Sequence, residues 1–158
     1  MYEIGDMVAH PKHGAGIIDR IEEKNMYGCT RTYCYIKDLD GGMISYFPIE
    51  CAEQIGVRPI IDSDQADELM AAIPKINAEM TANWNKRHRE NLELLTSGNL
   101  LEVARVVKGL MIRNNEKELS TGERKMLQNA KQIFISEIVL STKLTSEEVE
   151  SRINASLA

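Results

Sequence analysis

Short hydrophobic runs broken by turn residues fill the first sixty residues of the chain. In one such run, Cys34 and Ile36 alternate with Tyr35 and Lys37, which is typical of a strand with one buried face. Two further runs, GAGIIDRIEEK and GMISYFPI, are rich in β-branched or aromatic residues. We therefore expect four or five short strands that form a small SH3-like or Tudor-like barrel. Within it, Phe47 is expected in the barrel core.

Turn signals separate these runs. The turn segment NMYG follows the run GAGIIDRIEEK. The segment DLDGG separates the run that contains Cys34 and Ile36 from the run GMISYFPI. The Asp40-Gly41-Gly42 step predicts a tight turn between two strands. In the segment GDMVAHPKHGAGII, Pro11 and His13 are interpreted as turn structure and not as a site.

From about residue 62 onward the apolar residues recur every three or four positions, as on amphipathic helices. Pro74 ends the first helical pattern, Asn83 is a good N-cap for the second, and Ser120 with Glu123 predicts a capping box. The five predicted helices span about 62–73, 83–96, 99–114, 120–140 and 145–156.

The period thus changes from strand to helix near residue 58. The expected fold class is α+β, with an N-terminal β-barrel followed by an all-α part of about five helices. We place the two domains at residues 1–58 and 59–158.

Charge and composition narrow the function. The net charge of -5 excludes a protein that coats nucleic acid in bulk, since neutralising phosphates needs a surplus of Lys and Arg, although a local patch can still bind DNA. No run of about 18 apolar residues predicts a membrane span, and the N-terminus has no signal-peptide pattern. The odd number of cysteines argues against a secreted disulfide scaffold and favours the cytoplasm.

No catalytic constellation is visible in the sequence. Cys29, Cys34 and Cys51 lack the close pairing of zinc ligands, and buried structural thiols are the preferred interpretation. His10 and His13 lie in a predicted turn. We therefore expect a binding protein that is not an enzyme and needs no cofactor or metal, with a thiol or metal enzyme left as a rival hypothesis.

The single tryptophan, Trp84, stands beside the densest basic cluster, Lys86, Arg87 and Arg89. Two interpretations are open. Trp84 is either the first core residue of a helix, or it projects from the start of that helix, where cations and backbone N–H groups could hold a phosphate and the indole could wedge into DNA.

Three motifs resemble those of the CarD/CdnL family of bacterial transcription regulators. GDMVAHPKHGAGII is similar to the family's opening motif, NWNKRHRENLELLTSGN resembles its tryptophan motif, and LSTGERKMLQNAKQIFISEI resembles a later one. They occur in the family's order and at its spacing, from residue 4 to about 140.

The resemblance implies a Tudor-like domain that docks on the β subunit of RNA polymerase and a helical domain that binds promoter DNA with little sequence specificity. The implied role is to stabilise the open complex through a tryptophan wedge, matched by Trp84, in the minor groove at the upstream edge of the transcription bubble. Arg87 and Arg89, with Lys86, would contact the DNA backbone. The protein would act as a monomer, associated with the nucleoid through the polymerase.

Candidate residues for the polymerase contact are Lys24, Tyr46 and Pro48. At the position of Tyr46 the family can carry a basic residue, so this chain departs from the pattern there. The alternative function is a protein–protein adaptor in which Trp84 is buried.

Overall fold

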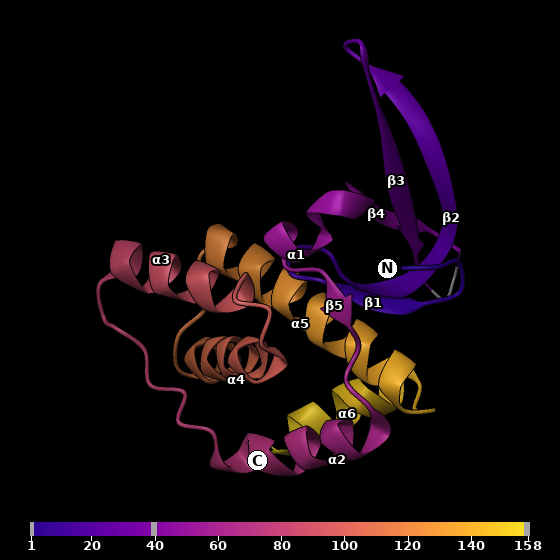
Figure 1. Ribbon diagram of the computed structural model, residues 1–158. Helices are drawn as coiled ribbons and strands as arrows, with labels where there is room; N and C mark the ends of the chain where they lie inside the picture. The colour runs from indigo at the N-terminus through magenta and orange to yellow at the C-terminus, as the bar shows by residue number, and fades with distance from the viewer. Residues whose placement is uncertain (1, 39–40, 157–158) are drawn as a thin grey trace.

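The computed structural model describes residues 2–38 and 41–156 and confirms the α+β fold class (Figure 1). The N-terminal part is one antiparallel sheet with the strand order β4-β3-β2-β1-β5. Its strands are β1 (Met7–His10), β2 (Gly14–Met26), β3 (Cys29–Lys37), β4 (Met43–Pro48) and β5 (Arg58–Pro59). Asp40 lies outside the described residues, so the turn predicted at Asp40-Gly41-Gly42 stays a prediction.

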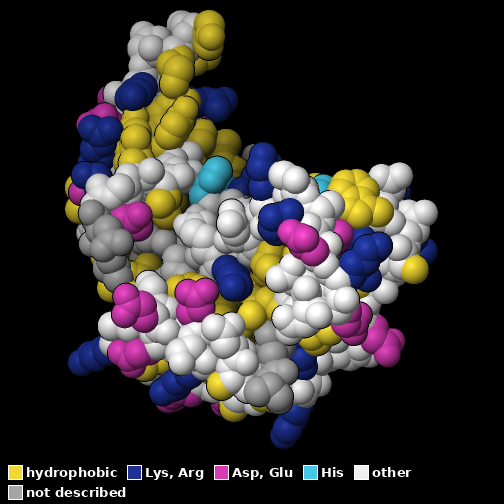
Figure 2. Space-filling model, turned by 180° about the vertical axis from the view of Figure 1, so that it is seen from behind, with side chains coloured by type: hydrophobic (Ala, Val, Ile, Leu, Met, Phe, Trp, Pro, Cys, Tyr) yellow, Lys and Arg dark blue, Asp and Glu magenta, His cyan; other side chains and the backbone are white. Residues whose placement is uncertain are grey.

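β2 and β3 form a long hairpin that projects from the body of the molecule (Figure 1). Its turn falls in the predicted NMYG segment, and both Tyr27 (φ 52°) and Gly28 (φ 79°) adopt the positive φ that tight hairpin turns require. A break in register between Ile18 and Arg20 bends β2. Figure 2 shows hydrophobic side chains at the tip of this hairpin, where Met26 and Tyr27 are exposed.

The described residues form six α-helices, joined in places by short 3-10 turns at Ile49–Cys51 and Ile73–Lys75. Five of them confirm the five predicted helices to within two residues at each end, and the short α1 was not expected. The helices are α1 (Ala52–Ile55), α2 (Ser63–Ala72), α3 (Trp84–Leu95), α4 (Leu100–Glu116), α5 (Thr121–Ser141) and α6 (Ser146–Ser156).

Two hydrophobic clusters fill the interior. The sheet cluster includes Ile18, Cys34 and Phe47, and the 1% exposure of Phe47 confirms its predicted place in the core. The helical cluster is centred on α4 and α5 and includes Leu110 and Phe134. Tyr35, on the other face of the sheet from Cys34, is also buried, because the side chains of Arg20, Lys24 and Tyr46 lie against its ring.

The turn between β1 and β2 packs directly on α5. The backbone N–H of Ala15 donates to Ser136 Oγ (2.9 Å), and Gln132 Nε2 donates to the carbonyl of His13 (3.1 Å). Gly14 has φ +93°, and a Cβ added there would lie 2.7 Å from Ser136 Oγ. Pro11 and His13 are turn residues, as predicted, but the turn also forms part of the joint between the sheet and the helices.

His10, at the end of β1, makes folding sensitive to acid. The residue is 6% exposed, and its Nδ1 accepts a hydrogen bond from the backbone N–H of Lys12 (3.1 Å). Burial, helped by His13 and Lys12, lowers the pKa of His10 from 6.5 to about 4. Between these values the unfolded chain binds the proton and the folded chain does not, so acid favours unfolding.

We therefore expect the unfolding free energy to be unaffected by His10 above about pH 6.5 and to fall as the pH drops from there to about 4. The loss should be at most about 3 kcal/mol. Urea denaturation at several pH values measures it, with His10→Asn as the control, because the amide oxygen can accept the same hydrogen bond. An equally steep pH dependence in His10→Asn would contradict the assignment.

Candidate nucleic-acid interface

Trp84 is the first residue of α3, and its indole is both exposed and fixed. The side chain of Asn83 caps the helix by accepting from the backbone N–H of Lys86 (3.0 Å), as predicted. The indole stacks on His88, with the ring centroids 5.0 Å apart and the planes at 11°. Its Nε1–H donates to Ser120 Oγ (3.3 Å), and the residue keeps 42% of its surface exposed. The alternative with a buried Trp84 is therefore wrong.

Two helix N-termini meet at the indole. Ser120 is the N-cap of α5, and its hydroxyl oxygen accepts from both Trp84 Nε1 and the backbone N–H of Glu123. The ring edge lies over Gly122, where an added Cβ would be 3.5 Å from Trp84 Cζ2. Since the N-terminal end of a helix carries a partial positive charge, both α3 and α5 make this surface favourable for an anion.

Arg87 differs from its basic neighbours, because its side chain is buried. The side chain is 4% exposed, and its guanidinium makes a two-pronged pair with Glu123, Nε to Oε2 at 2.9 Å and Nη2 to Oε1 at 3.0 Å. Its Nη1 donates to the carbonyls of Thr81 and Ala82. The expectation that Arg87 faces the DNA backbone is thus corrected: in this structure it positions the start of α3.

The same pair changes the role of Glu123. Its backbone N–H bonds to Ser120, which is half of the predicted capping box, but its carboxylate faces Arg87 instead of turning back to Ser120. Hydrogen bonds from Arg87 lower the pKa of Glu123, and they also raise the pKa of Arg87. The sequence pattern correctly predicted Ser120 as the N-cap, but the carboxylate of Glu123 makes a contact between two helices instead of completing the capping box.

Lys86 and Arg89 are exposed on α3, and neither lies on the side of the helix that carries Trp84, because two and five residues correspond to turns of about 200° and 140°. Lys86 approaches Glu90 at 4.0 Å. Lys86 and Arg89 are three residues apart, so together they form a small basic patch on the side of α3 that faces away from the indole.

Other cations border the indole on its own side. A hollow of about 410 Å³ beside Trp84 is lined by Arg113 and Lys117 from the end of α4 and by Arg124 from the start of α5. Arg124 is 3.5 Å from Glu118 and keeps 55% of its side chain exposed. None of these three was among the predicted site residues, although Arg113 and Arg124 lie in the third and fourth predicted helices and Lys117 lies between those helices.

The structure gathers the three predicted polymerase-contact residues on one face of the sheet. Tyr46 stacks on Tyr35 (centroids 5.6 Å apart), and Lys24 Nζ lies 5.2 Å from the centroid of the Tyr35 ring. Pro48 is opposite Tyr33 in the β3–β4 register. Arg20, with its guanidinium carbon 4.2 Å from the Tyr35 centroid, completes a face that the sequence pattern did not reveal.

The cysteines and histidines form no comparable site. Cys34 is buried, Cys51 is partly exposed and Cys29 is exposed, so the interpretation of all three thiols as buried is confirmed for Cys34 alone. Within residues 2–38 and 41–156, no group of three or more His, Cys, Asp or Glu residues is placed to hold a metal ion. No helix among the described residues has the length and apolar character to cross a bilayer.

Comparison with known proteins decides the family. The model of the CarD-like/TRCF RID domain matches residues 2–61, and the model of the CarD C-terminal domain matches residues 68–154. The chain belongs to the CarD family. A curated relative from Bacillus subtilis (strain 168), named "Putative transcription factor YdeB", is 31% identical over 151 residues, which cover 96% of this chain and 99% of the relative.

Membership of the CarD family makes the chain a transcription regulator and confirms the resemblance seen in the sequence. The three motifs fall on the parts of the structure that matter for the site. The first forms β1, its turn and the start of β2, the second forms α3, and the third forms most of α5. All three motifs therefore lie at, or directly support, the contacts described above.

The pair of Arg87 and Glu123 should control the stability of this site. Arg87→Met leaves Glu123 buried without a cation, which typically costs about 3–5 kcal/mol of unfolding free energy. The double variant Arg87→Met, Glu123→Leu should regain most of that loss, because neither charge remains. Urea denaturation of the single and double variants measures both effects. A single variant within about 1 kcal/mol of wild type would contradict the buried pairing.

The same pair predicts a pH dependence. Because the pKa of Glu123 is lowered in the folded state, its contribution to stability is present above about pH 4.5 and is lost as the pH falls through the folded pKa. This contribution should be absent from the double variant, which lacks the carboxylate.

Proposed function

We propose that this CarD-family protein binds bacterial RNA polymerase through its sheet and stabilises the promoter open complex with Trp84. The indole would enter the minor groove at the upstream edge of the transcription bubble. The observation that carries the proposal is an exposed indole held by His88 and Ser120 at two helix N-termini, with cations around it. This is the geometry of a wedge that is rigid before it meets its target.

A wedge acts on the strands of DNA through stacking. Bubble collapse requires the bases at the fork to stack again, and an indole that fills the unstacked step opposes this by a few kcal/mol. Each 1.4 kcal/mol changes an equilibrium tenfold, so the effect on open-complex occupancy is large. Such a wedge responds to how easily a base step deforms and little to base identity, so we expect weak sequence specificity.

Two groups of cations would contact the DNA phosphates and so position the indole in the groove. Lys86 and Arg89 are exposed on α3, and Arg113, Lys117 and Arg124 border the hollow beside the ring. On the face shown in Figure 2, however, basic and acidic side chains are intermixed. With a net charge of -5, the protein should bind free DNA weakly and salt-sensitively.

RNA polymerase would therefore supply the affinity by holding this weak site close to the promoter. The match to the CarD-like/TRCF RID domain supports a contact between residues 2–61 and the polymerase, which we propose is on the β subunit. The face with Lys24, Tyr46 and Pro48 is the proposed contact, and β4 is an edge strand that offers its backbone for pairing. With these partners, we expect the protein in the bacterial cytoplasm, associated with the nucleoid through the polymerase.

The test is the lifetime of open complexes formed by the cognate polymerase on a promoter that melts slowly. Wild-type protein should lengthen this lifetime, and with Trp84→Ala the lengthening should be smaller by about tenfold or more. The stability of the Trp84→Ala variant should change little, because the indole is partly exposed. Leu92→Ala, which removes another exposed apolar side chain of α3, is the matched control. Equal lifetimes with wild type and Trp84→Ala would refute the wedge.

A second arm of the same experiment tests the polymerase contact. The double variant Lys24→Ala, Tyr46→Ala should bind the β subunit less tightly, and its effect on lifetime should return when its concentration is raised. Trp84→Ala, in contrast, should bind the β subunit normally and remain inactive at any concentration.

A further inference from the structure

Helix α5 carries a buried glutamate near each end. Glu123 is 4% exposed and Glu137 is 1% exposed, which makes them the two buried carboxylates among the described residues. A buried carboxylate is costly unless a cation and hydrogen bonds compensate it. Each of the two is compensated in the same way, by an arginine from another element that donates two parallel hydrogen bonds.

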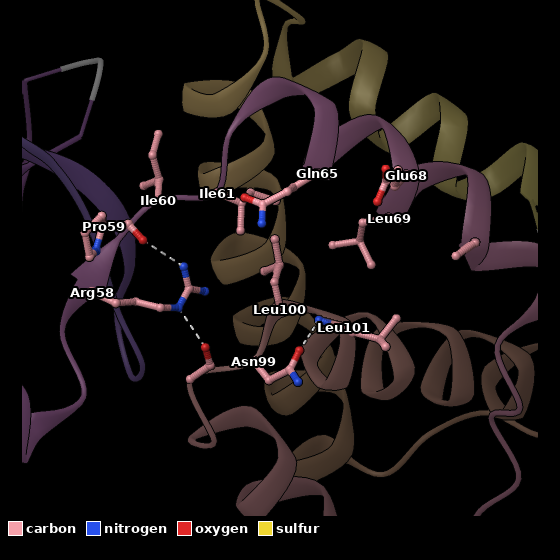
Figure 3. Close-up of a pocket in the computed structure, with 12 residues that line it drawn as sticks. Arg58, Pro59, Ile60, Ile61, Gln65, Glu68, Leu69, Asn99, Leu100 and Leu101 are labelled. Atoms are coloured by element: carbon pink, nitrogen blue, oxygen red, sulfur yellow. Dashed lines mark hydrogen bonds between the residues drawn. The ribbon is translucent and has the colours of Figure 1, made fainter.

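The partner of Glu137 is Arg58, from the edge strand β5 of the sheet. Arg58 Nη1 and Nη2 donate to the carboxylate at 2.6 and 2.8 Å, and the backbone N–H of Ile61 donates to it at 3.0 Å. Arg58 also donates through Nε to the carbonyl of Gly98 (2.7 Å), in the turn that follows α3. Figure 3 shows this side chain reaching from β5 to that turn.

The partner of Glu123 is Arg87, beside Trp84. Fourteen residues separate the two glutamates, which corresponds to about 21 Å and almost four helical turns, so both carboxylates lie near the same side of α5. One end of the helix is thereby tied to the sheet and the other to the start of α3. Figure 1 shows α5 running between these two parts of the molecule.

We propose that α5 is a rigid strut that fixes the wedge relative to the polymerase-docking face, and that Arg58 and Glu137 are its positioning residues. The inference rests on the proposed function, since it explains how binding at one face is converted into placement of Trp84 at another. A flexible connection would leave the indole to search for the fork after docking. A rigid one avoids that entropic cost at the moment of binding.

An ion pair with a buried carboxylate suits this role because it favours one geometry more than it adds stability. Replacing such a pair with apolar residues is often neutral for stability, whereas its two-pronged hydrogen bonds allow a single orientation. The contact of the β1–β2 turn with Gln132 and Ser136 lies next to the pair along α5 and restricts the same joint. Gly14 permits the close approach there, since a Cβ would collide with Ser136 Oγ.

The test compares wild type with Arg58→Met, Glu137→Leu, which removes both charges and replaces them with apolar side chains. The matched control is Lys131→Met, Glu150→Met, which removes a pair between α5 and α6 whose carboxylate side chain is 51% exposed. Spin labels are placed on the native, exposed Cys29 and on Glu118→Cys, an 80% exposed side chain near Trp84, with Cys34→Ala and Cys51→Ala in all versions. The distance distribution between the labels is measured by double electron–electron resonance.

Wild type and the control pair should give one narrow distance distribution, and the Arg58–Glu137 variant a distribution at least twice as broad. The variant should bind the isolated β subunit and free promoter DNA as wild type does, yet lose most of the extension of open-complex lifetime. A distribution that stays narrow in the folded variant would overturn the strut, and so would a broad one that leaves the lifetime effect intact.

The distance measurement does not depend on the proposed function. If wild-type protein failed to extend the open-complex lifetime at all, the wedge would be refuted, whereas the widths of the distributions would still decide whether Arg58 and Glu137 fix the joint.

Discussion

Burying a carboxylate inside a protein requires a cation and hydrogen bonds to compensate it, because the loss of hydration far exceeds what other contacts return. In this CarD-family chain that constraint acts twice on one helix, at Glu123 and Glu137. Each carboxylate draws an arginine from a distant part of the chain, and each arginine also holds backbone carbonyls. These contacts fix the positions of the start of α3 and of the edge strand β5 relative to α5.

The exposed indole depends on the buried pair beneath it. A tryptophan at the first position of a helix would ordinarily turn toward the core, since burial of its large surface is favourable. Here Arg87 and Glu123 form a buried pair beside the start of α3, and Trp84 stacks on His88 with its nitrogen bonded to Ser120. The result is a hydrophobic surface that is exposed yet rigid, as a wedge for DNA requires.

The structural features that depend on residues close together in the chain could be predicted from the sequence. The five helices, the caps at Asn83 and Ser120 and the core place of Phe47 follow from periodicity and local hydrogen bonding, and the exposure of Trp84 followed from the family resemblance. The predictions that were wrong or missing concern residues whose partners are distant in the chain. Arg87 was predicted as a surface cation because its carboxylate partner lies 36 residues away in the chain. Strand β5 was not predicted because two residues are too few for a periodic pattern, and the partner of Arg58 lies 79 residues further along the chain. Cations that gather around Trp84 from other helices were invisible for the same reason.

The most direct test of the central claim is where residue 84 lies in the complex of this protein with polymerase and promoter. A photo-crosslinking amino acid, p-benzoylphenylalanine, would replace Trp84, and the attached nucleotides would be mapped on both strands. The account predicts crosslinks to DNA at the upstream edge of the bubble that require the polymerase to be present. Crosslinks confined to protein, or scattered along free DNA without polymerase, would contradict it.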